Sequence, residues 1–362
     1  MADWPVRLQP SVDAALRDLG SDDVESRVSA ISAIAAGDPD ALGREARTAL
    51  AAALGDSSPK VRAAAALALA ELGAGSAGEE RTGTLDRLVE LAGDPDGTVA
   101  QAAVIALGES GEPRVLATVE RALGSRDADV RFQAVLAVAR LGGVGAIATL
   151  AGAADDPDPE VRANVAAALA DLGHESGAPT LERLLADADE AVRVEAALAL
   201  AQRGDRRSTP VLVAALGNAE AAPQAVRALA LLRDPAAVEP LRKLGARWTA
   251  RAPLRAAAAA ALAALDDPAG WRELDGWLRS RRREPRAMAV HAAGELALSG
   301  AVDRLVEMLR DPSLPDRDGV ARSLGAIGDP RARDALAAAT DDPDPDVALE
   351  ARRALDSLER RA

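Results

Sequence analysis

The side chains best suited to catalysis are scarce in this sequence of 362 residues. It has two histidines, His174 and His291, which lie 117 positions apart, and it has neither cysteine nor tyrosine. Acid–base catalysis draws most often on histidine, and cysteine supplies thiolate nucleophiles and zinc ligands. No Ser-His-Asp arrangement, phosphate-binding loop or paired metal motif can be assembled. We therefore expect no catalytic residue, no metal site and no cofactor.

Arginine and tryptophan, which are suited to binding, gather in one segment. Residues 227–286 hold thirteen basic and seven acidic side chains, although the whole chain has a net charge of −14. Three of the four tryptophans also fall in this segment. Arginine matches carboxylates and phosphates, and Arg and Trp often dominate the binding energy of interfaces. The segment predicts a basic docking patch on two turns, formed by Arg247, Trp248, Arg251, Arg279, Arg281, Arg282 and Arg283.

The partner expected for this patch is another protein with an acidic or phosphorylated segment, or an anionic surface. The acidity of the rest of the chain argues against nucleic acid as a partner. A second interpretation stays open, in which the positive segment only balances acidic turns of the same molecule. The repeat phase places Trp271 in the core and Trp248 in a turn between helices.

A repeated unit must position these residues. The unit begins with Val-Arg and ends near Leu-Gly, most clearly at Val61, Val130, Val161 and Val192. With weaker copies included, successive units start 29 to 38 residues apart, and about eleven units fill the chain. Each unit shows two stretches with helical periodicity, and turns rich in Asp and Pro supply helix starts. Strand-like alternation does not occur.

These repeats predict an all-α fold, an α-solenoid of about eleven stacked antiparallel helix pairs. We expect a single domain over residues 1–362, with degenerate repeats over 1–55 and a C-terminal capping repeat over 329–362. Alanine, about a quarter of the chain, favours helices and allows them to approach closely. Function is then expected on the surfaces of the array.

The pattern Asp-x-x-Val-Arg-x-x-Ala-x-x-Ala-Leu-x-x-Leu-Gly resembles the HEAT repeat, in its short bacterial form called phycobilisome-lyase HEAT-like. The resemblance covers essentially the whole chain and is best in the copies that begin at Val130, Val161 and Val192. It implies a non-enzymatic scaffold or adaptor that binds a partner protein. Two enzymatic alternatives come with it, a bilin lyase-type subunit and an alkylpurine DNA glycosylase-type enzyme. Trp271 and Asp275 could imitate the Trp and Asp of the latter.

Three further polar patterns have structural interpretations. The arginine that follows Val recurs as Arg62, Arg131, Arg162, Arg193 and Arg255. Its position beside the turn aspartates predicts an Asp–Arg ladder between adjacent units. The acidic clusters 155–160 and 341–346 predict helix caps, because they lack the spacing of a calcium loop. The histidines are expected as packed or surface residues.

The face of the second helices is expected to be polar, mostly acidic and not hydrophobic. Its exposed positions are predicted to be Glu71, Glu109, Arg140, Asp171, Glu195 and Gln202, in a surface that also includes Gln133 and Asn164. Such a face is either simply solvated or a groove for a basic protein segment.

No apolar core of a signal peptide follows the N-terminal residues, and the apolar stretches 63–70 and 256–265 are shorter than a membrane span. We therefore expect no secretory signal, no membrane span and a cytoplasmic location. The sequence does not indicate an oligomeric state.

Overall fold

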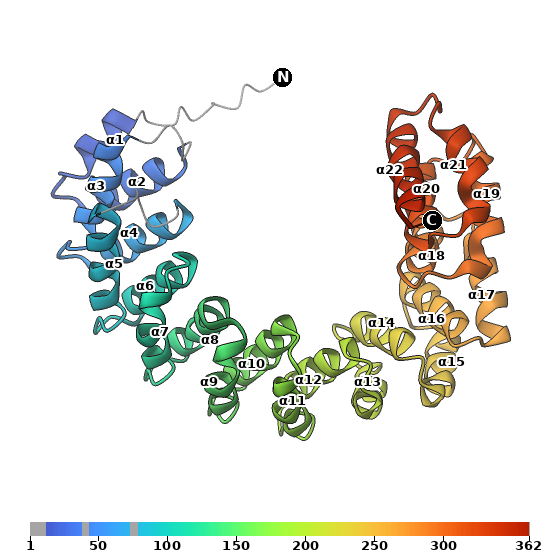
Figure 1. Cartoon of the computed structure of the whole chain (residues 1–362), viewed down its shortest axis with the longest axis horizontal. Coiled ribbons are helices and arrows are strands. Elements are labelled where there is room, and N and C mark those ends of the chain that lie inside the picture. The colour runs from blue at the N-terminus through green and yellow to red at the C-terminus, as the bar shows by residue number, and fades with distance from the viewer. Residues whose placement is uncertain (1–11, 38–42, 73–78, 362) are drawn as a thin grey trace. The chain divides into compact units, whose positions relative to one another are not determined.

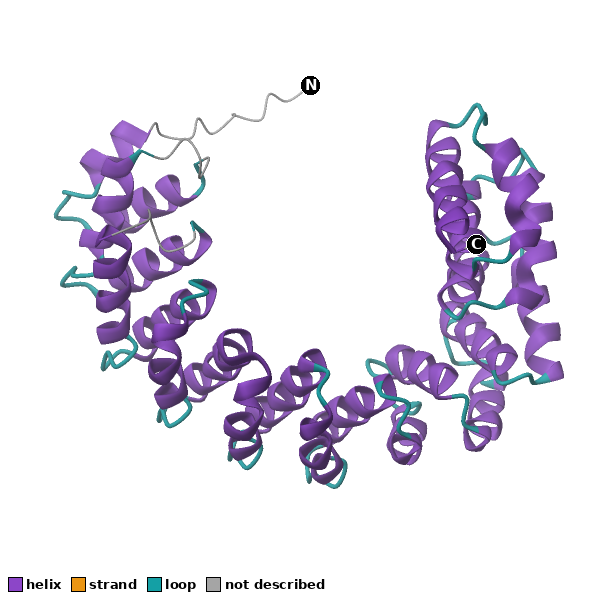
Figure 2. Cartoon of the chain, viewed as in Figure 1, coloured by secondary structure: helices purple, strands orange, loops and turns teal. Residues whose placement is uncertain are grey.

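Helices account for every regular element in the part of the chain that the structure describes. The computed structural model describes residues 12–37, 43–72 and 79–361, and Figure 2 shows helices and loops without a strand among them. In these described ranges the α-helices follow one another as eleven pairs, which Figure 1 labels α1 to α22. The predicted all-α solenoid of helix pairs is confirmed.

Each pair consists of a first and a second helix. The first helices are α1 (Val12–Asp18), α3 (Arg44–Ala53), α5 (Glu79–Leu91), α7 (Leu116–Ala122), α9 (Ile147–Ala153), α11 (Ala178–Leu184), α13 (Thr209–Ala215), α15 (Val238–Ala246), α17 (Pro268–Leu278), α19 (Val302–Arg310) and α21 (Arg333–Ala339). The second helices are α2 (Val24–Ala35), α4 (Pro59–Glu71), α6 (Gly97–Glu109), α8 (Ala128–Gly142), α10 (Pro159–Leu172), α12 (Glu190–Gln202), α14 (Ala222–Leu232), α16 (Ala252–Ala264), α18 (Arg283–Glu295), α20 (Arg317–Ile327) and α22 (Pro345–Arg361).

Aspartates begin several second helices, as the composition of the turns predicted. The carboxylates of Asp96, Asp127 and Asp158 accept hydrogen bonds from amides in the first turns of α6, α8 and α10. These bonds satisfy N–H groups that have no partner inside the helix. At the other end, Gly173 and Gly328 stop α10 and α20 in the left-handed conformation, with φ of 64° and 74°. Glycine adopts this conformation without steric strain.

An arginine at the fourth residue of a second helix joins its repeat to the next one. In α10, Arg162 donates from Nε and Nη2 to the two carboxylate oxygens of Asp187 in the following turn, both at 2.8 Å. Its Nη1 donates to the carbonyl oxygens of Asp156 and Pro157 in its own turn, at 2.8 and 3.2 Å. One guanidinium therefore fastens two turns with four hydrogen bonds, two of them to a charged acceptor.

The same ion pair recurs along the chain. Equivalent pairs are Arg27–Asp56, Arg62–Asp94, Arg131–Asp156 and Arg317–Asp342. The Arg131 and Asp156 side chains are only 11% and 7% exposed, so their pairing is largely shielded from water. The predicted Asp–Arg ladder is confirmed at Arg62, Arg131 and Arg162.

Small residues let neighbouring second helices approach closely. A Cβ atom added to Gly108 of α6 would lie 2.9 Å from the Ala137 Cβ of α8. One added to Gly325 of α20 would lie 2.6 Å from the Ala354 Cβ of α22. Glycine inside a helix costs about 1 kcal/mol of helix stability, and close packing of the two backbones offsets this cost here.

Contacts divide the chain into two compact units, residues 1–192 and 193–362. The N-terminal unit contains α1 to α11, the C-terminal unit contains α13 to α22, and α12 contains the boundary. Within each unit the second helices pack in a row and the first helices cover one side of that row (Figure 1). The repeat pattern continues through the boundary without a linker.

One stretch, residues 128–153, is long and apolar enough to cross a membrane by length and composition alone. It is longer than the apolar stretches 63–70 and 256–265, from which no membrane span was expected. The stretch does not form one straight helix, because Gly143 takes a φ of 50° after the end of α8. The chain then continues into α9, which packs back against α8. Both helices contribute to the core of the array.

Candidate partner-binding surfaces

Two turns carry the predicted basic patch. Residues 247–251 connect α15 to α16, and residues 279–282 connect α17 to α18. Five predicted residues in these turns are exposed and have no side-chain hydrogen bond or ion pair within the described chain: Arg247, Trp248, Arg251, Arg281 and Arg282. We call these five residues the Arg/Trp ridge.

Trp248 is the most exposed large apolar side chain in the described residues, at 88%. It lies between the helix ends formed by Arg247 and Arg251, and no ring or cation of the described residues lies over its indole. An exposed indole offers a large apolar surface and one N–H donor. The position in a turn that the sequence predicted for Trp248 is confirmed.

The two turns belong to neighbouring layers of the array. A Cβ atom on Gly245 of α15 would lie 3.3 Å from the Glu273 Oε2 of α17, so these first helices are adjacent. Helix α16 packs against both α17 and α18. Since both turns leave the C-terminal ends of adjacent first helices, they lie on the same edge of the C-terminal unit.

The remaining two predicted patch residues are engaged in ion pairs. The Nε of Arg279 donates to the Asp275 carboxylate at 2.7 Å. Arg283 was expected in the turn, but it is the first residue of α18 and lies 2.6 Å from the Asp316 carboxylate. The charges of these two arginines are therefore partly neutralised inside the molecule.

Arg255 does not join the ladder, and this part of the prediction is wrong. Its Nε donates to the Gly245 carbonyl at 2.8 Å, and its guanidinium lies 5.6 Å from the centre of the Trp277 ring. The turn of the following repeat has Ser280 where other repeats have the accepting aspartate, so Arg255 has no carboxylate partner among the described residues. A cation over an indole face is a favourable substitute.

Trp271 and Asp275 are engaged within the C-terminal unit. The Trp271 ring is partly buried and covers Gly300, where a Cβ atom would lie 2.6 Å from the ring. Asp275 binds Arg279, as described above. Trp271 was expected in the core, and the structure places it at the edge of the core.

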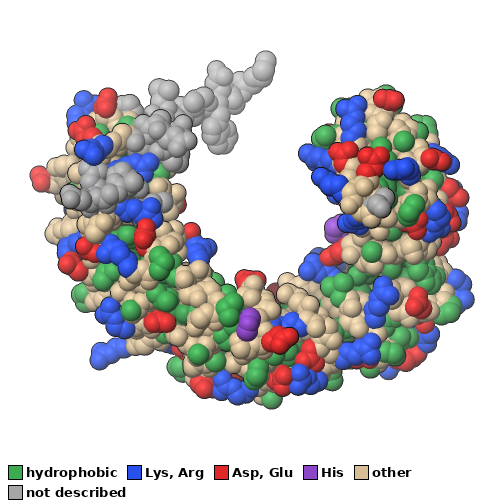
Figure 3. Space-filling view, in the orientation of Figure 1, with side chains coloured by type: hydrophobic (Ala, Val, Ile, Leu, Met, Phe, Trp, Pro, Cys, Tyr) green, Lys and Arg blue, Asp and Glu red, His purple; other side chains and the backbone are tan. Residues whose placement is uncertain are grey.

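The second-helix face of the N-terminal unit is less polar than predicted. Glu71, Glu109, Arg140 and Asp171 are exposed as expected, and Glu109 pairs with Arg140 between α6 and α8. Leu67 of α4 and Leu136 of α8 are also exposed on second helices, at 41% and 43%. On the side of the molecule that Figure 3 shows, hydrophobic side chains lie among the charged ones. These two leucines add apolar surface to a face that was expected to be polar and mostly acidic.

Two predicted polar positions of second helices are drawn inward. Asn164 of α10 is buried and donates to the Phe132 carbonyl of α8 at 2.9 Å. Glu195 of α12 is half-buried, and burial raises the pKa of its carboxyl. Gln202 at the end of α12 is exposed, as predicted. Asn164 therefore serves helix packing and is not part of an open surface.

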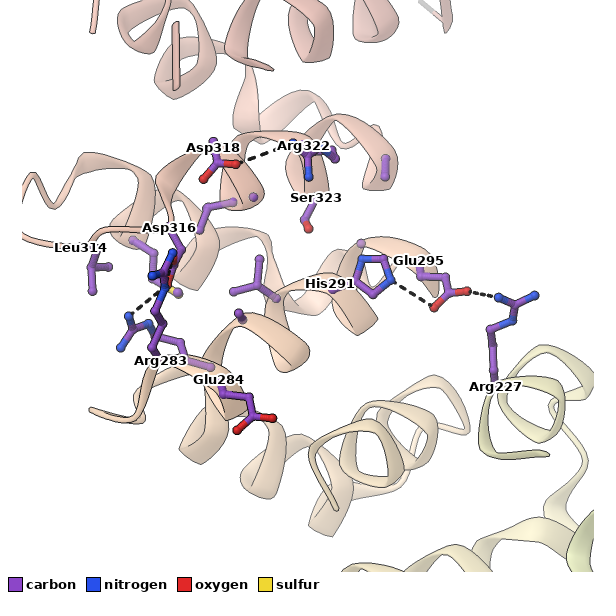
Figure 4. A pocket seen from close by; sticks show the side chains of 18 residues that line it. Arg227, Arg283, Glu284, His291, Glu295, Leu314, Asp316, Asp318, Arg322 and Ser323 are labelled. Atoms are coloured by element: carbon purple, nitrogen blue, oxygen red, sulfur yellow. Dashed lines mark hydrogen bonds and ion pairs between the residues drawn. The ribbon is translucent and has the colours of Figure 1, made fainter. Parts of the chain in front are cut away.

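A groove that the sequence did not predict lies between α18 and α20 (Figure 4). It has a volume of about 840 Å³, and its lining includes the apolar side chains of Val290, Val320 and Leu314. Small residues such as Gly294 and Ser323 keep the two helices close. All residues that line the groove belong to the C-terminal unit.

The charged side chains of this groove pair with one another. Glu295 lies 2.9 Å from Arg227 and 3.8 Å from His291 (Figure 4). Arg322 lies 3.6 Å from Asp318. Because most charges are matched, the groove has no strong preference for an anion or a cation. His291 is an exposed surface residue.

The described residues contain no group of three or more His, Asp or Glu that could hold a metal ion. Members of the acidic clusters act as caps and ladder partners. Asp158 accepts the amide of Glu160 at 2.8 Å, and Asp344 accepts the amide of Asp346 at 3.0 Å. His174 caps a short 3-10 turn through Ser176.

Models of protein families match most of the chain. A model of HEAT repeats matches residues 85–158, 148–223 and 274–356. A further HEAT-repeat model matches residues 47–76, and a model of the PBS lyase HEAT-like repeat matches residues 224–244. The resemblance drawn from the Val-Arg units is confirmed. No curated protein matches the chain in sequence.

Solved structures with the same fold differ strongly in sequence. YibA of Escherichia coli is 18% identical with a TM-score of 0.56, and the match covers 71% of this chain and 93% of YibA. Yeast importin-β, Kap95p, is 13% identical with a TM-score of 0.66, and the match covers 97% of this chain and 57% of Kap95p. A structure of Kap95p bound to RanGDP has a TM-score of 0.57 at 14% identity, covering 98% of this chain and 57% of that one. These likenesses concern the fold.

Proposed function

The chain belongs to the HEAT-repeat family, and on this premise we propose that it is a non-enzymatic, cytoplasmic scaffold that binds another protein. An array of helix pairs presents long surfaces and few enclosed sites, which suits binding of macromolecules. One protein with a similar fold, Kap95p, binds RanGDP. The catalytic groups that an enzyme would need are scarce in this chain.

The proposed docking site is the Arg/Trp ridge, and its proposed partner is an acidic or phosphorylated segment of a protein. The observation that carries this proposal is the exposure of Trp248 beside arginines that have no partner in the described chain. An unpaired guanidinium keeps its donors free for carboxylates or phosphates. The indole adds apolar contact area, and together they resemble the central residues of many interfaces.

The surroundings of the ridge favour a short segment over an extended anionic surface. The turn before the ridge contains exposed Glu220, and the turn after it begins with exposed Asp311. A flat anionic surface would meet these carboxylates as well as the arginines. Two layers span roughly 20 Å at a helix spacing of about 10 Å, which an extended peptide of about six residues covers.

The ridge can be tested with a fluorescein-labelled peptide of six residues that contains glutamates, one leucine and one phosphoserine. The ridge variant changes Arg247, Arg281 and Arg282 to Glu. The matched control changes Arg17, Arg310 and Arg360 to Glu, since these exposed arginines also lack an ion pair in the described residues. We expect fluorescence anisotropy to show at least roughly tenfold weaker binding for the ridge variant alone at low salt, and a smaller difference at high salt. Equal binding by both variants would refute the ridge.

The enzymatic alternatives have separate tests. A bilin lyase-type protein purified from its host should carry colour in a visible absorption spectrum. A glycosylase-type protein should shift a DNA duplex in a salt-sensitive manner. We expect neither signal, because the chain has few aromatic side chains to line a tetrapyrrole groove and a net charge of −14.

A further inference from the structure

The Asp–Arg ladder has a gap in the N-terminal unit. The fourth residue of α4 is Arg62 and that of α8 is Arg131, but the fourth residue of α6 is Ala100. The following turn also lacks its acceptor, because Ser125 stands where Asp94 and Asp156 stand in other turns. No side chain of the described residues therefore ties the turn at 94–96 to the turn at 125–127 in the usual way.

A cavity occupies the gap. It has a volume of about 860 Å³ and is lined on one side by Asp94, Pro95 and Ala100, and on the other by Ser125 and Asp127. In the repeat of Arg131, the carbonyl oxygens of Ser125 and Arg126 accept Nη1 at 3.0 and 3.3 Å. The equivalent carbonyl oxygens here belong to Asp94 and Pro95, and within the described chain they accept no hydrogen bond.

A carboxylate lies beside these carbonyl groups. One oxygen of Asp127 accepts the Asp129 amide at 2.9 Å as a helix cap, and the other has no hydrogen bond in the described residues. A Cβ atom on Gly97 would overlap this carboxylate, so glycine at that position makes room for it. The cavity thus combines a carboxylate with two carbonyl acceptors, the same kinds of group that hold each ladder arginine, although this carboxylate belongs to the cap residue Asp127 and not to position 125.

We propose that this cavity binds the guanidinium of an arginine supplied by a basic partner segment. The chain itself shows the ligand chemistry, because guanidinium groups occupy the equivalent position in α2, α4, α8 and α10. The N-terminal unit has 32 acidic and 16 basic residues, which attracts a basic segment over long range.

Two arginines of the chain also line the cavity, and neither takes the vacant position. Arg121 donates to the Ala117 carbonyl at 3.2 Å and to the Thr118 hydroxyl at 3.0 Å. Arg126 is exposed and has no side-chain hydrogen bond in the described chain. The proposed site lies in the N-terminal unit and its test does not depend on the Arg/Trp ridge.

The test uses the full chain and two neutral-ended tripeptides, acetyl-Gly-Arg-Gly-amide and the same peptide with citrulline in place of arginine. Citrulline keeps the planar shape and loses the charge. We expect the arginine peptide to shift the NMR amide signals of Gly97 and Asp127 and to bind at least roughly tenfold more tightly than the citrulline peptide. Equal binding of the two peptides, or no shift with arginine, would overturn the proposal.

Three variants separate this site from general attraction to an acidic surface. Asp127→Asn keeps the helix cap and should weaken binding of the arginine peptide, whereas Asp158→Asn changes the equivalent cap of α10 and should not. Ala100→Arg together with Ser125→Asp should complete the ladder, abolish binding and raise the Tm. Unchanged binding in Asp127→Asn and in the double variant would show that the cavity is not the site.

Discussion

The two units of this protein share one repeat and differ sharply in charge. The N-terminal unit, residues 1–192, has 32 acidic and 16 basic side chains, whereas the C-terminal unit, residues 193–362, has 25 acidic and 27 basic ones. Their net charges are therefore −16 and +2. Both units nevertheless contain the same buried Asp–Arg pairs, such as Arg131–Asp156 and Arg317–Asp342. The buried ion pairs that join the repeats are therefore common to both units, whereas the net charge of the surface differs between them.

The contrast extends to single repeat positions. Five residues after the ladder arginines Arg62 and Arg131, the N-terminal unit has exposed Leu67 and Leu136. The equivalent arginines of the C-terminal unit include Arg286, which pairs with Asp316, and Arg317. Five residues after them are His291 and Arg322. Both proposed binding sites also lie where the ladder is interrupted. The cavity replaces the pair that Ala100 cannot make, and the Arg/Trp ridge flanks Arg255, which has no carboxylate partner. Where no Asp–Arg pair joins two repeats, polar groups of the turns are left available to another molecule.

The largest expected effect is the loss of a ladder arginine in either unit. Arg131→Ala leaves a buried aspartate and two turn carbonyls without their partner, which should cost about 2 kcal/mol. Arg317→Ala should cost a similar amount in the other unit. Arg183→Ala removes an exposed pair with Asp155 and should cost less than about 0.5 kcal/mol. Native-state hydrogen exchange reports each unit separately. A large loss of stability in only one unit would show that the Asp–Arg pairs do not stabilise both units alike.

Acid should weaken both units over the same range of pH. Hydrogen bonding to Arg317 holds the pKa of Asp342 below its ordinary value. Burial raises the pKa of Asp156, but hydrogen bonds from Arg131 and the Asp158 amide outweigh it and keep the pKa low. Carboxylates with lowered pKa values stabilise the folded state above an unfolded pKa of about 3.9, and this stability is lost as the pH falls through the folded pKa. Circular dichroism should show stability constant from neutral pH to about 5 and falling below about 4. A loss that begins near pH 6 would contradict the ladder as its source.

Added salt should change the stability of the two units differently, but by less than the loss of a ladder arginine does. Self-repulsion among charges of one sign destabilises a compact state, and salt screens it. Added sodium chloride should therefore increase the protection of amides in the N-terminal unit and leave those of the C-terminal unit nearly unchanged. Hydrogen exchange of the full chain at low and high salt measures both in one sample. Equal responses would mean that the charge difference has no energetic consequence for the fold.

The fold was predictable because its determinants are local and repeated. Helical periodicity, capping aspartates and the Val-Arg step each appear many times, so errors in single copies do not matter. Each candidate binding site, in contrast, occurs only once in the described chain, and the sites were predicted less well. The exposure of Trp248 followed from its place in a turn, but the pairing of Arg283 with Asp316 depends on a residue in the next repeat.

The cavity beside Ala100 shows what sequence reasoning missed. The sequence shows Ala100 and Ser125 where other repeats have an arginine and an aspartate. Whether a cavity results depends on the distance between the two turns, which the sequence does not give. Similarly, the groove between α18 and α20 depends on how closely Gly294 approaches Ser323. Leu67 and Leu136 follow the helical apolar pattern, and only the packed array shows that they face outward.

The most direct test of the proposed scaffold is affinity capture with the full chain from an extract of its source cells. Quantitative mass spectrometry would compare the wild type, the ridge variant with Arg247, Arg281 and Arg282 changed to Glu, and the matched control with Arg17, Arg310 and Arg360 changed to Glu. The account predicts that the control captures the same acidic or phosphorylated protein as the wild type, while the ridge variant loses it at low salt. Equal capture of that protein by the ridge variant and the control would contradict the account.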